Sequence, residues 1–360
     1  MERYNIYHRQ DGRYEGRISR GRRKNGRRKF QYFFGRTKDE VKEKIEKVRS
    51  LEKKNNECSK TVLEVYEEFY RSVKHRIKQS TAANYQMKAV KHIIPAFGKK
   101  RIDAVSEMDI YAFMETKRNE GLSNRYIADI IILIKTIFKY AVKVYQIFNP
   151  MDNISLPKKK NSEIAILDTE QQCRLEQYIT KNPNRTTLGV ALSMFTGIRI
   201  GELCALQWKD INLEKRILTV RKTLQRIQCR DSFRKTKLVI TEPKSESSKR
   251  HIPIPEFMIT FLKEFQGKTE QYVLSGNDKP IEPRTMQYRF AKILKNVKLP
   301  SVHFHTLRHM FASNCIKLGF DIKALSEILG HSSVEITLNR YVHSSFDQKI
   351  EYMSRLKSMT

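Results

Sequence analysis

Apolar residues recur every three or four positions along much of the segment 61–150, which is the spacing of one buried face of an α-helix. The second helix should end before Pro95, because proline lacks the amide hydrogen that continues a helix, and the third at Gly121. The four predicted helices span 62–73, 85–94, 106–120 and 123–144. We therefore expect an all-helical domain over residues 61–150, followed by a basic, proline-bearing linker at 149–160.

Residues 1–36 follow a different pattern, in which short β-prone runs alternate with turns. Asp11-Gly12 and Asn25-Gly26 separate the runs, and such pairs are typical of tight hairpin turns. The runs lie at 4–7, 14–18 and 30–34. Residues 37–54 then carry apolar side chains at helical spacing, so three strands and a helix are expected to form a small module at 1–55.

The last part of the chain, residues 163–360, is expected to be mostly helical with a small antiparallel sheet. Asp168 should cap a helix that runs through Ile179. Strands are predicted at 217–220, 237–241 and 249–254. The second and third of these strands should form a hairpin with Lys244 at its turn. Together the three segments predict a multidomain α+β protein.

The chain carries 70 basic and 39 acidic residues, a net charge of +31. A charge this positive indicates a polyanionic partner, for which nucleic acid is the first candidate. A membrane surface is the competing polyanion. However, we find no signal peptide, and the most apolar run, Ile130–Ile134, is bracketed by Asp129 and Lys135. No membrane partner is therefore expected.

The N-terminal module is itself basic, with 12 Lys or Arg against 3 acidic residues through residue 36. Basic residues interleaved with aromatic ones favour DNA binding over the alternative, a solvated arginine-rich turn. The candidate DNA-binding residues are Arg20, Arg22, Arg23, Lys24, Arg27, Arg28 and Lys29.

The five cysteines are odd in number, widely scattered and without a CxxC pair, so neither disulfides nor a metal knuckle is indicated. This fits a reducing cytoplasm. His303, His305 and His309 lie close together in sequence, but no nearby Cys or carboxylate completes a zinc ligand set, and we expect no metal site.

Six residues carry chemistry that suits a phosphodiester. In chain order they are Arg199, Lys244, His305, Arg308, His331 and Tyr341. The planar guanidiniums of Arg199 and Arg308 match the charged non-bridging oxygens of a phosphate and of its transition state. A tyrosine phenol has a pKa of about 10, so Tyr341 needs activation to act as a nucleophile.

The remaining three residues can donate or accept protons. Lys244 is the candidate general acid for a deoxyribose 5′-hydroxyl leaving group. His305 and His331 can accept the tyrosine proton or hydrogen-bond the phosphate, and their division of labour is left open. Taken singly, each of the six residues has an ordinary structural explanation, such as a solvated hairpin lysine or a core tyrosine. Their joint order and local context favour the catalytic interpretation.

The motifs Thr-Gly-Ile-Arg, Pro-Lys, His-Thr-Leu-Arg-His and Leu-Gly-His-Ser-Ser, followed by a tyrosine, resemble the active site of the tyrosine recombinases. The layout of nearly the whole chain is similar to their phage and conjugative-transposon integrase branch. The resemblance implies an arm-type DNA-binding module at 1–55, a SAM-like core-binding domain at 61–150 and a catalytic domain at 163–360. It also implies a site-specific recombinase that integrates and excises a mobile element through a 3′-phosphotyrosyl intermediate, with no metal or nucleotide cofactor.

The partners implied by the resemblance are double-stranded DNA attachment sites, with core and arm sequences, and further copies of the chain in a homotetramer. An excision factor and a DNA-bending host protein are further candidates, and the expected location is the cytoplasm, with the nucleoid. A type IB topoisomerase and a non-catalytic DNA-binding relative are the alternatives. Phe346, Ile350 and Met353 also predict a short C-terminal tail helix that docks on its own catalytic domain or on a neighbour's.

Overall fold

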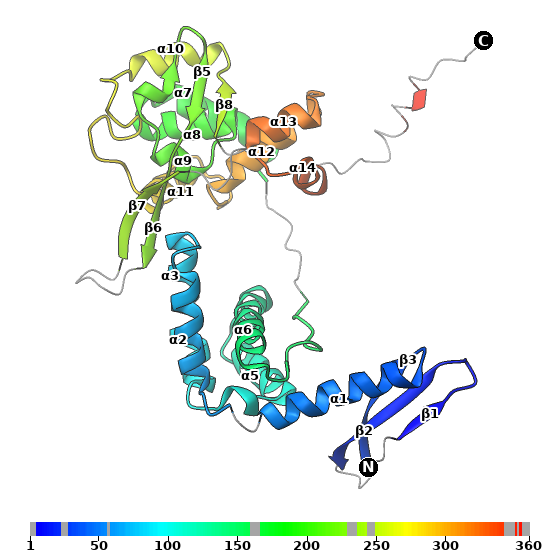
Figure 1. The fold of residues 1–360 in the computed structure, drawn as a ribbon. Coiled ribbons are helices and arrows are strands. Elements are labelled where there is room, and N and C mark those ends of the chain that lie inside the picture. Colours follow the sequence, from blue (N-terminus) through cyan, green and yellow to red (C-terminus); the bar gives the residue numbers. More distant parts are fainter. Residues whose placement is uncertain are drawn as a thin grey trace. The chain divides into compact units, whose positions relative to one another are not determined.

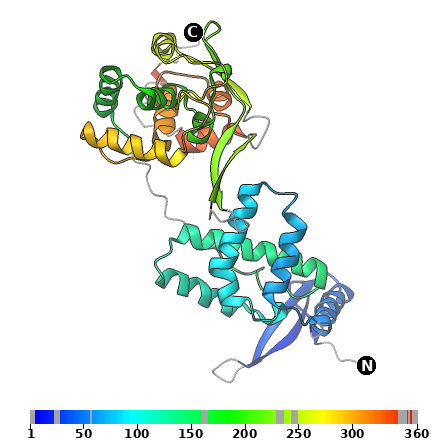
Figure 2. The same ribbon diagram turned by 90° about the vertical axis from the view of Figure 1, so that its left-hand side faces the viewer.

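The chain divides into two units, residues 1–161 and 162–360, and each is considered by itself (Figures 1 and 2). The computed structural model describes residues 5–22, 28–55, 58–158, 166–228, 236–242, 249–341, 350 and 353–354. Helices dominate both units and each contains small antiparallel sheets, which confirms the predicted α+β class.

The first unit begins with a three-stranded antiparallel sheet followed by a helix. Its elements are β1 (Ile6–His8), β2 (Tyr14–Arg22), β3 (Arg28–Gly35) and α1 (Lys38–Asn55) (Figure 1). One face of the sheet packs on α1, where a Cβ added to Gly16 would lie 2.6 Å from carbons of both Val41 and Ile45. Only glycine permits so close an approach. The predicted strands and helix are confirmed, with β2 and β3 longer than their apolar runs suggested.

The rest of the first unit is helical, with α2 and α5 packed against the largely buried α6. Thr61 and Ser106 begin α2 and α5 with capping boxes, which satisfy amides that the first turn leaves unpaired. The helices are α2 (Val62–Val73), α3 (Gln79–Lys88), α4 (Ile94–Phe97), α5 (Glu107–Asn119) and α6 (Asn124–Tyr145). The predicted first, third and fourth helices are therefore confirmed.

The prediction for the second helix was wrong at both ends. The helix begins at Gln79, and it continues past Pro95 into α4 through a π-helical turn at Ala89–Ile93. A π-turn widens the backbone, so it accommodates the proline ring without the clash that a regular helix would impose. Pro95 also lies in the first turn of α4, where its missing amide hydrogen is not needed.

The helices of the second unit surround α8, which is buried on almost every side. The first helix is capped by Asp168 as predicted, and Trp208 lies in the core at 5% exposure. The helices are α7 (Thr169–Lys181), α8 (Arg185–Thr196), α9 (Ile200–Cys204), α10 (Phe257–Glu264), α11 (Pro283–Asn296), α12 (His305–Lys317), α13 (Ile322–Leu329) and α14 (Val334–Tyr341). Within the described ranges of both units, no helix combines the length and the apolar character needed to cross a membrane.

The described residues of the second unit form two antiparallel sheets, where one was predicted. The first has the strand order β4 (Ile211–Asn212), β5 (Ile217–Val220), β8 (Arg250–Pro253), and the second pairs β6 (Thr223–Gln228) with β7 (Thr236–Thr241). The predicted hairpin of 237–241 with 249–254 is therefore wrong, because those two strands belong to different sheets. Strand β6 was not predicted, and it pairs with β7 along its whole length.

The predicted tail helix falls largely outside the residues that the structure describes. Of this stretch only Ile350, Met353 and Ser354 are placed, and the side chains of Ile350 and Met353 are exposed. Its docking therefore stays a prediction.

Candidate active site

Arg199 is positioned by a sharp turn between α8 and α9. Gly197 ends α8 in the left-handed region, with a φ of 64°, and a Cβ added there would lie 2.5 Å from Phe311. Two residues later, Arg199 stands at the N-cap of α9 and donates from its backbone N and from Nη1 to the Glu202 carboxylate, at 3.1 and 2.8 Å. Glu202 therefore holds Arg199 in place at the start of α9.

Arg308 approaches the same turn from α12. It is 2% exposed and donates from Nη1 to the carbonyl of Gly197 at 2.8 Å and from Nη2 to the carbonyl of Leu329 at 2.6 Å. Arg199 donates from Nη2 to the next carbonyl, that of Gly330, at 2.8 Å. The structure thus brings Arg199 and Arg308 together at the carboxyl end of α13, one residue before His331.

His331 has its ring anchored by α14. Its Nδ1 lies 2.8 Å from the hydroxyl of Thr337, which is fully buried. If Nδ1 accepts the hydroxyl hydrogen, Nε2 carries the ring proton; if Nδ1 donates, Nε2 is the basic nitrogen. Either arrangement fixes the plane of the ring and makes Nε2 the nitrogen that can exchange a proton or a hydrogen bond with a substrate.

His305 is the first residue of α12 and is exposed, with its ring 4.7 Å from that of the buried His309 in an edge-on contact. His309 lies on the same helix as Arg308 and is 5% exposed. Arg308 follows His305 by three positions on α12, so the two residues share a helix face.

Tyr341 is the last described residue of α14, and its side chain lies outside what the structure describes. Residues four apart share one face of a helix, so α14 places position 341 one turn beyond Thr337, the residue that holds His331. Lys244 also lies outside the described residues, in the segment between β7 and β8.

The charges around Arg199 are partly balanced by one buried carboxylate. Glu202 is 5% exposed; burial raises its pKa, but the charges and hydrogen bonds of Arg250 and Arg199 outweigh burial and hold the pKa below its usual value. Arg250 reaches the same carboxylate with Nη2 at 2.9 Å. Among the described bonds, three guanidiniums thus gather around one carboxylate and the end of α13, an arrangement in which a phosphate could bind.

Cysteine is a poor alternative nucleophile in this region. Burial raises the pKa of Cys204, on α9, to about 12 and that of Cys315, on α12, to about 11. A thiol attacks as its thiolate, which is scarce at neutral pH for such groups. Among the described residues, no group of three His, Cys, Asp or Glu side chains is arranged to bind a metal ion.

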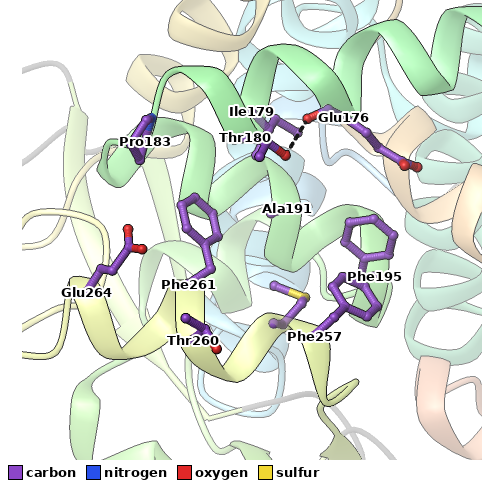
Figure 3. A pocket seen from close by; sticks show the side chains of 11 residues that line it. Glu176, Ile179, Thr180, Pro183, Ala191, Phe195, Phe257, Thr260, Phe261 and Glu264 are labelled. Atoms are coloured by element: carbon purple, nitrogen blue, oxygen red, sulfur yellow. Dashed lines mark hydrogen bonds between the residues drawn. The ribbon is translucent and has the colours of Figure 1, made fainter.

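A pocket of about 380 Å³ lies between α7, α8 and α10 (Figure 3). Phe195, Phe257 and Phe261 supply its aromatic lining, and none of the four predicted site residues whose side chains the structure describes is among the residues that line it. We assign it no part in the chemistry.

The open face of the N-terminal sheet is the candidate DNA interface. Strand register places Tyr7, Arg17, Tyr32 and Phe34 on the face away from α1, and the Arg17 guanidinium lies 4.3 Å from the centre of the Tyr7 ring. Of the predicted contacts, Arg23, Lys24 and Arg27 lie outside the described residues. Arg20, Arg22, Arg28 and Lys29 belong to β2 and β3, but their side chains are not among those described.

Comparison with known proteins agrees with this geometry. A model of the phage integrase family matches residues 165–348, more than half of the chain, and a model of the phage integrase N-terminal SAM-like domain matches residues 61–117. The chain belongs to the phage integrase family. It is thus a tyrosine-type site-specific recombinase, an enzyme that breaks and rejoins DNA strands, and the predicted family, function and enzyme class are confirmed.

The similarity to individual relatives extends over most of the chain. A XerC-like tyrosine recombinase of Caldanaerobacter subterraneus subsp. tengcongensis is 27% identical over 380 residues, 96% of each chain. The ICEBs1 integrase of Bacillus subtilis is 24% identical over 75% of each. The Tn1549 transposon integrase, solved with a circular-intermediate DNA, has the same fold: its TM-score is 0.69 at 24% identity, covering 83% of this chain and all of that one.

Two residues that contact residues of this site, Thr337 and Arg250, were not predicted from the sequence. Thr337 lies four positions before Tyr341 on α14, a helix that was not predicted from the sequence. Arg250 shares the buried face of β8 with Ile252, and an arginine at such a position usually has a buried partner. The identity of that partner could not be read from the sequence.

We expect Thr337→Val to slow covalent adduct formation about tenfold, because it removes one neutral hydrogen bond from the His331 ring while keeping the side-chain volume. Single-turnover trapping on a nicked core-site duplex measures the rate. Thr337→Ser keeps the hydroxyl and is the matched control. Equal rates for the Val variant and the parent would show that the hydroxyl does not position His331.

Proposed function

We propose that this recombinase integrates and excises a mobile element, with Tyr341 as the nucleophile that forms the 3′-phosphotyrosyl link. The observation that supports this role is the gathering of Arg199, Arg308 and His331 at the end of α13, immediately before the helix that ends at Tyr341. The chemistry then needs only a phosphate between the guanidiniums and the phenol.

In the proposed first step, the Tyr341 oxygen attacks the scissile phosphorus while the bond to the deoxyribose 5′-oxygen breaks. Arg199 and Arg308 stabilise the charge on the non-bridging oxygens, which increases in the transition state. His331 or His305 takes the phenol proton, and Lys244 delivers a proton to the leaving oxygen. The 5′-hydroxyl of another strand reverses these steps, so the bond energy is kept and no cofactor is required.

The proposed partners are double-stranded DNA core and arm sites and three further copies of the chain. A lambda integrase tetramer bound to a Holliday junction shares the fold, with a TM-score of 0.60 and 95% of this chain covered, which supports this assembly. We further propose an excision factor and a DNA-bending host protein as accessory partners and a cytoplasmic, nucleoid-associated location. The C-terminal tail would dock on a neighbouring copy.

The alternatives are less well supported. A type IB topoisomerase would rejoin the strand that it cut, whereas the family to which this chain belongs exchanges strands. A non-catalytic relative would be expected to lack some of the reactive side chains, but all six positions are occupied in this sequence.

Tyr341→Phe should abolish SDS-stable adducts on a labelled core-site duplex and leave DNA affinity nearly unchanged, because only the nucleophilic oxygen is removed. Adduct formation is read on denaturing gels, and affinity by mobility shift. Persistent adducts in this variant would place the nucleophile elsewhere.

Lys244→Ala should slow cleavage of ordinary DNA by roughly a hundredfold. On DNA with a 5′-bridging sulfur the variant should cleave at nearly the parent's rate, because a thiolate leaves without a proton. The ratio of single-turnover rates on the two substrates is the measurement. If both substrates are impaired equally, another group is the general acid.

Arg17→Ala should weaken binding to DNA from the end of the element roughly tenfold and lower the salt slope by about one, because Arg17 lies on the open aromatic face of the sheet. Lys42→Ala is the matched control, since it removes one positive charge from α1, which covers the opposite face. Fluorescence anisotropy at several salt concentrations provides both quantities. Equal losses in the two variants would argue against the sheet face as the binding surface.

A further inference from the structure

The carboxyl end of α13 accepts hydrogen bonds from three arginines on three successive carbonyls. Arg250 donates from Nε to Ile328 at 2.6 Å, Arg308 donates to Leu329 and Arg199 donates to Gly330. The last carbonyls of a helix have no partner within it and attract positive charge. Arg250 is thus the third member of a set whose other two members form the proposed phosphate clamp.

Arg250 differs from the other two because its charge is paired inside the protein. Its side chain is 5% exposed, whereas that of Arg199 is 34% exposed. Arg250 binds Oε2 of Glu202, and Arg199 Nη1 binds Oε1 of the same carboxylate. Glu202 is therefore shared between one buried and one accessible guanidinium.

We propose that Arg250 is a positioning residue for strand cleavage, which orients Arg199 through Glu202 and the His331 segment through the end of α13. This inference rests on the proposed function of Arg199 in clamping the scissile phosphate. Without Arg250, Glu202 has a single guanidinium as partner and draws Arg199 toward itself, away from the phosphate. With Arg250 in place, half of the carboxylate is already occupied.

Contact with Gly330 joins Arg250 to the His331 segment directly. Gly330 has a φ of 64°, and a Cβ added there would lie 2.9 Å from Cδ and 3.1 Å from Nε of Arg250. The arginine stem therefore packs on the residue that precedes His331. Arg250 also begins β8, six positions after Lys244 in the chain, so the same side chain is fixed close in sequence to the proposed general acid.

The geometry requires arginine rather than any cation. One planar guanidinium reaches the Ile328 carbonyl and the Glu202 carboxylate with different nitrogens, whereas a lysine ammonium is a single point of charge on a flexible stem. Arg250→Lys keeps the charge and tests the planar geometry. Arg250→Met removes both, with Arg216→Met as the matched control, because Arg216 also pairs with a glutamate, Glu256, but at the surface.

The test compares single-turnover adduct rates of the full chain on two core-site duplexes, one ordinary and one with an uncharged methylphosphonate at the scissile position. On ordinary DNA, Arg250→Met should form adducts about a hundredfold more slowly than the parent at saturating protein concentration. The Kd for the duplex should change by less than about threefold. On the methylphosphonate duplex the rate should fall by less than about tenfold, because a well-oriented Arg199 stabilises the transition state of an uncharged phosphonate less than that of a charged phosphate. Arg199→Ala should show the same pattern, and Arg216→Met should match the parent on both duplexes.

A second comparison keeps the test decisive if Arg250→Met does not fold. In a Glu202→Gln background no buried carboxylate is left unbalanced. Adding Arg250→Met to that background should therefore slow adduct formation much less than Arg250→Met does alone. Arg250→Lys should be slowed at least tenfold on ordinary DNA. Parent-like rates for Arg250→Lys, or additive losses in the double variant, would overturn the positioning role. Failure of the parent itself to form adducts would instead overturn the proposed function.

Discussion

The carboxyl end of α13 is the constraint on which the catalytic unit depends. Its final carbonyls need donors, and arginines from β8, α12 and the start of α9 supply them. One helix end therefore joins three elements that are far apart in sequence. Because His331 follows this end directly and contacts α14, the same bonds determine where the helix carrying Tyr341 begins.

Charge balance explains why this arrangement suits a phosphate. Burying a guanidinium is costly unless it is paired, and Glu202 is shared between Arg199 and Arg250, while the described bonds of Arg308 go to neutral carbonyls. The protein thus holds rigidly placed positive charge that its own carboxylate only partly neutralises. In the proposed mechanism, a phosphodiester bound at this cluster would supply negative charge at the point where the reaction increases it.

Close packing serves a different purpose in the N-terminal module. Gly16 lets α1 lie against one face of a three-stranded sheet, and the other face carries Tyr7, Tyr32 and Phe34 together with Arg17 and Glu15. That face is built from residues that alternate along the strands with the buried ones. The candidate DNA interface and the proposed cleavage site therefore differ in construction: one is a sheet face that carries aromatic side chains, and the other is a cluster of buried and partly buried charges.

From the sequence alone we predicted the N-terminal strands, the helices of the first unit except the course of the second, and the first helix of the second unit, because helical periodicity, capping residues and turn pairs are local properties. The six candidate site residues came from short motifs, which are also local. Pairing of β7 with β6 rather than β8 was decided by the tertiary structure, since a strand carries no local record of its partner. The passage of the helix through Pro95 likewise depended on packing that tolerates a π-turn. Arg250 became part of the site for the same reason: a guanidinium's partners, Glu202 and Ile328, lie 48 and 78 residues away, and only folding brings them together.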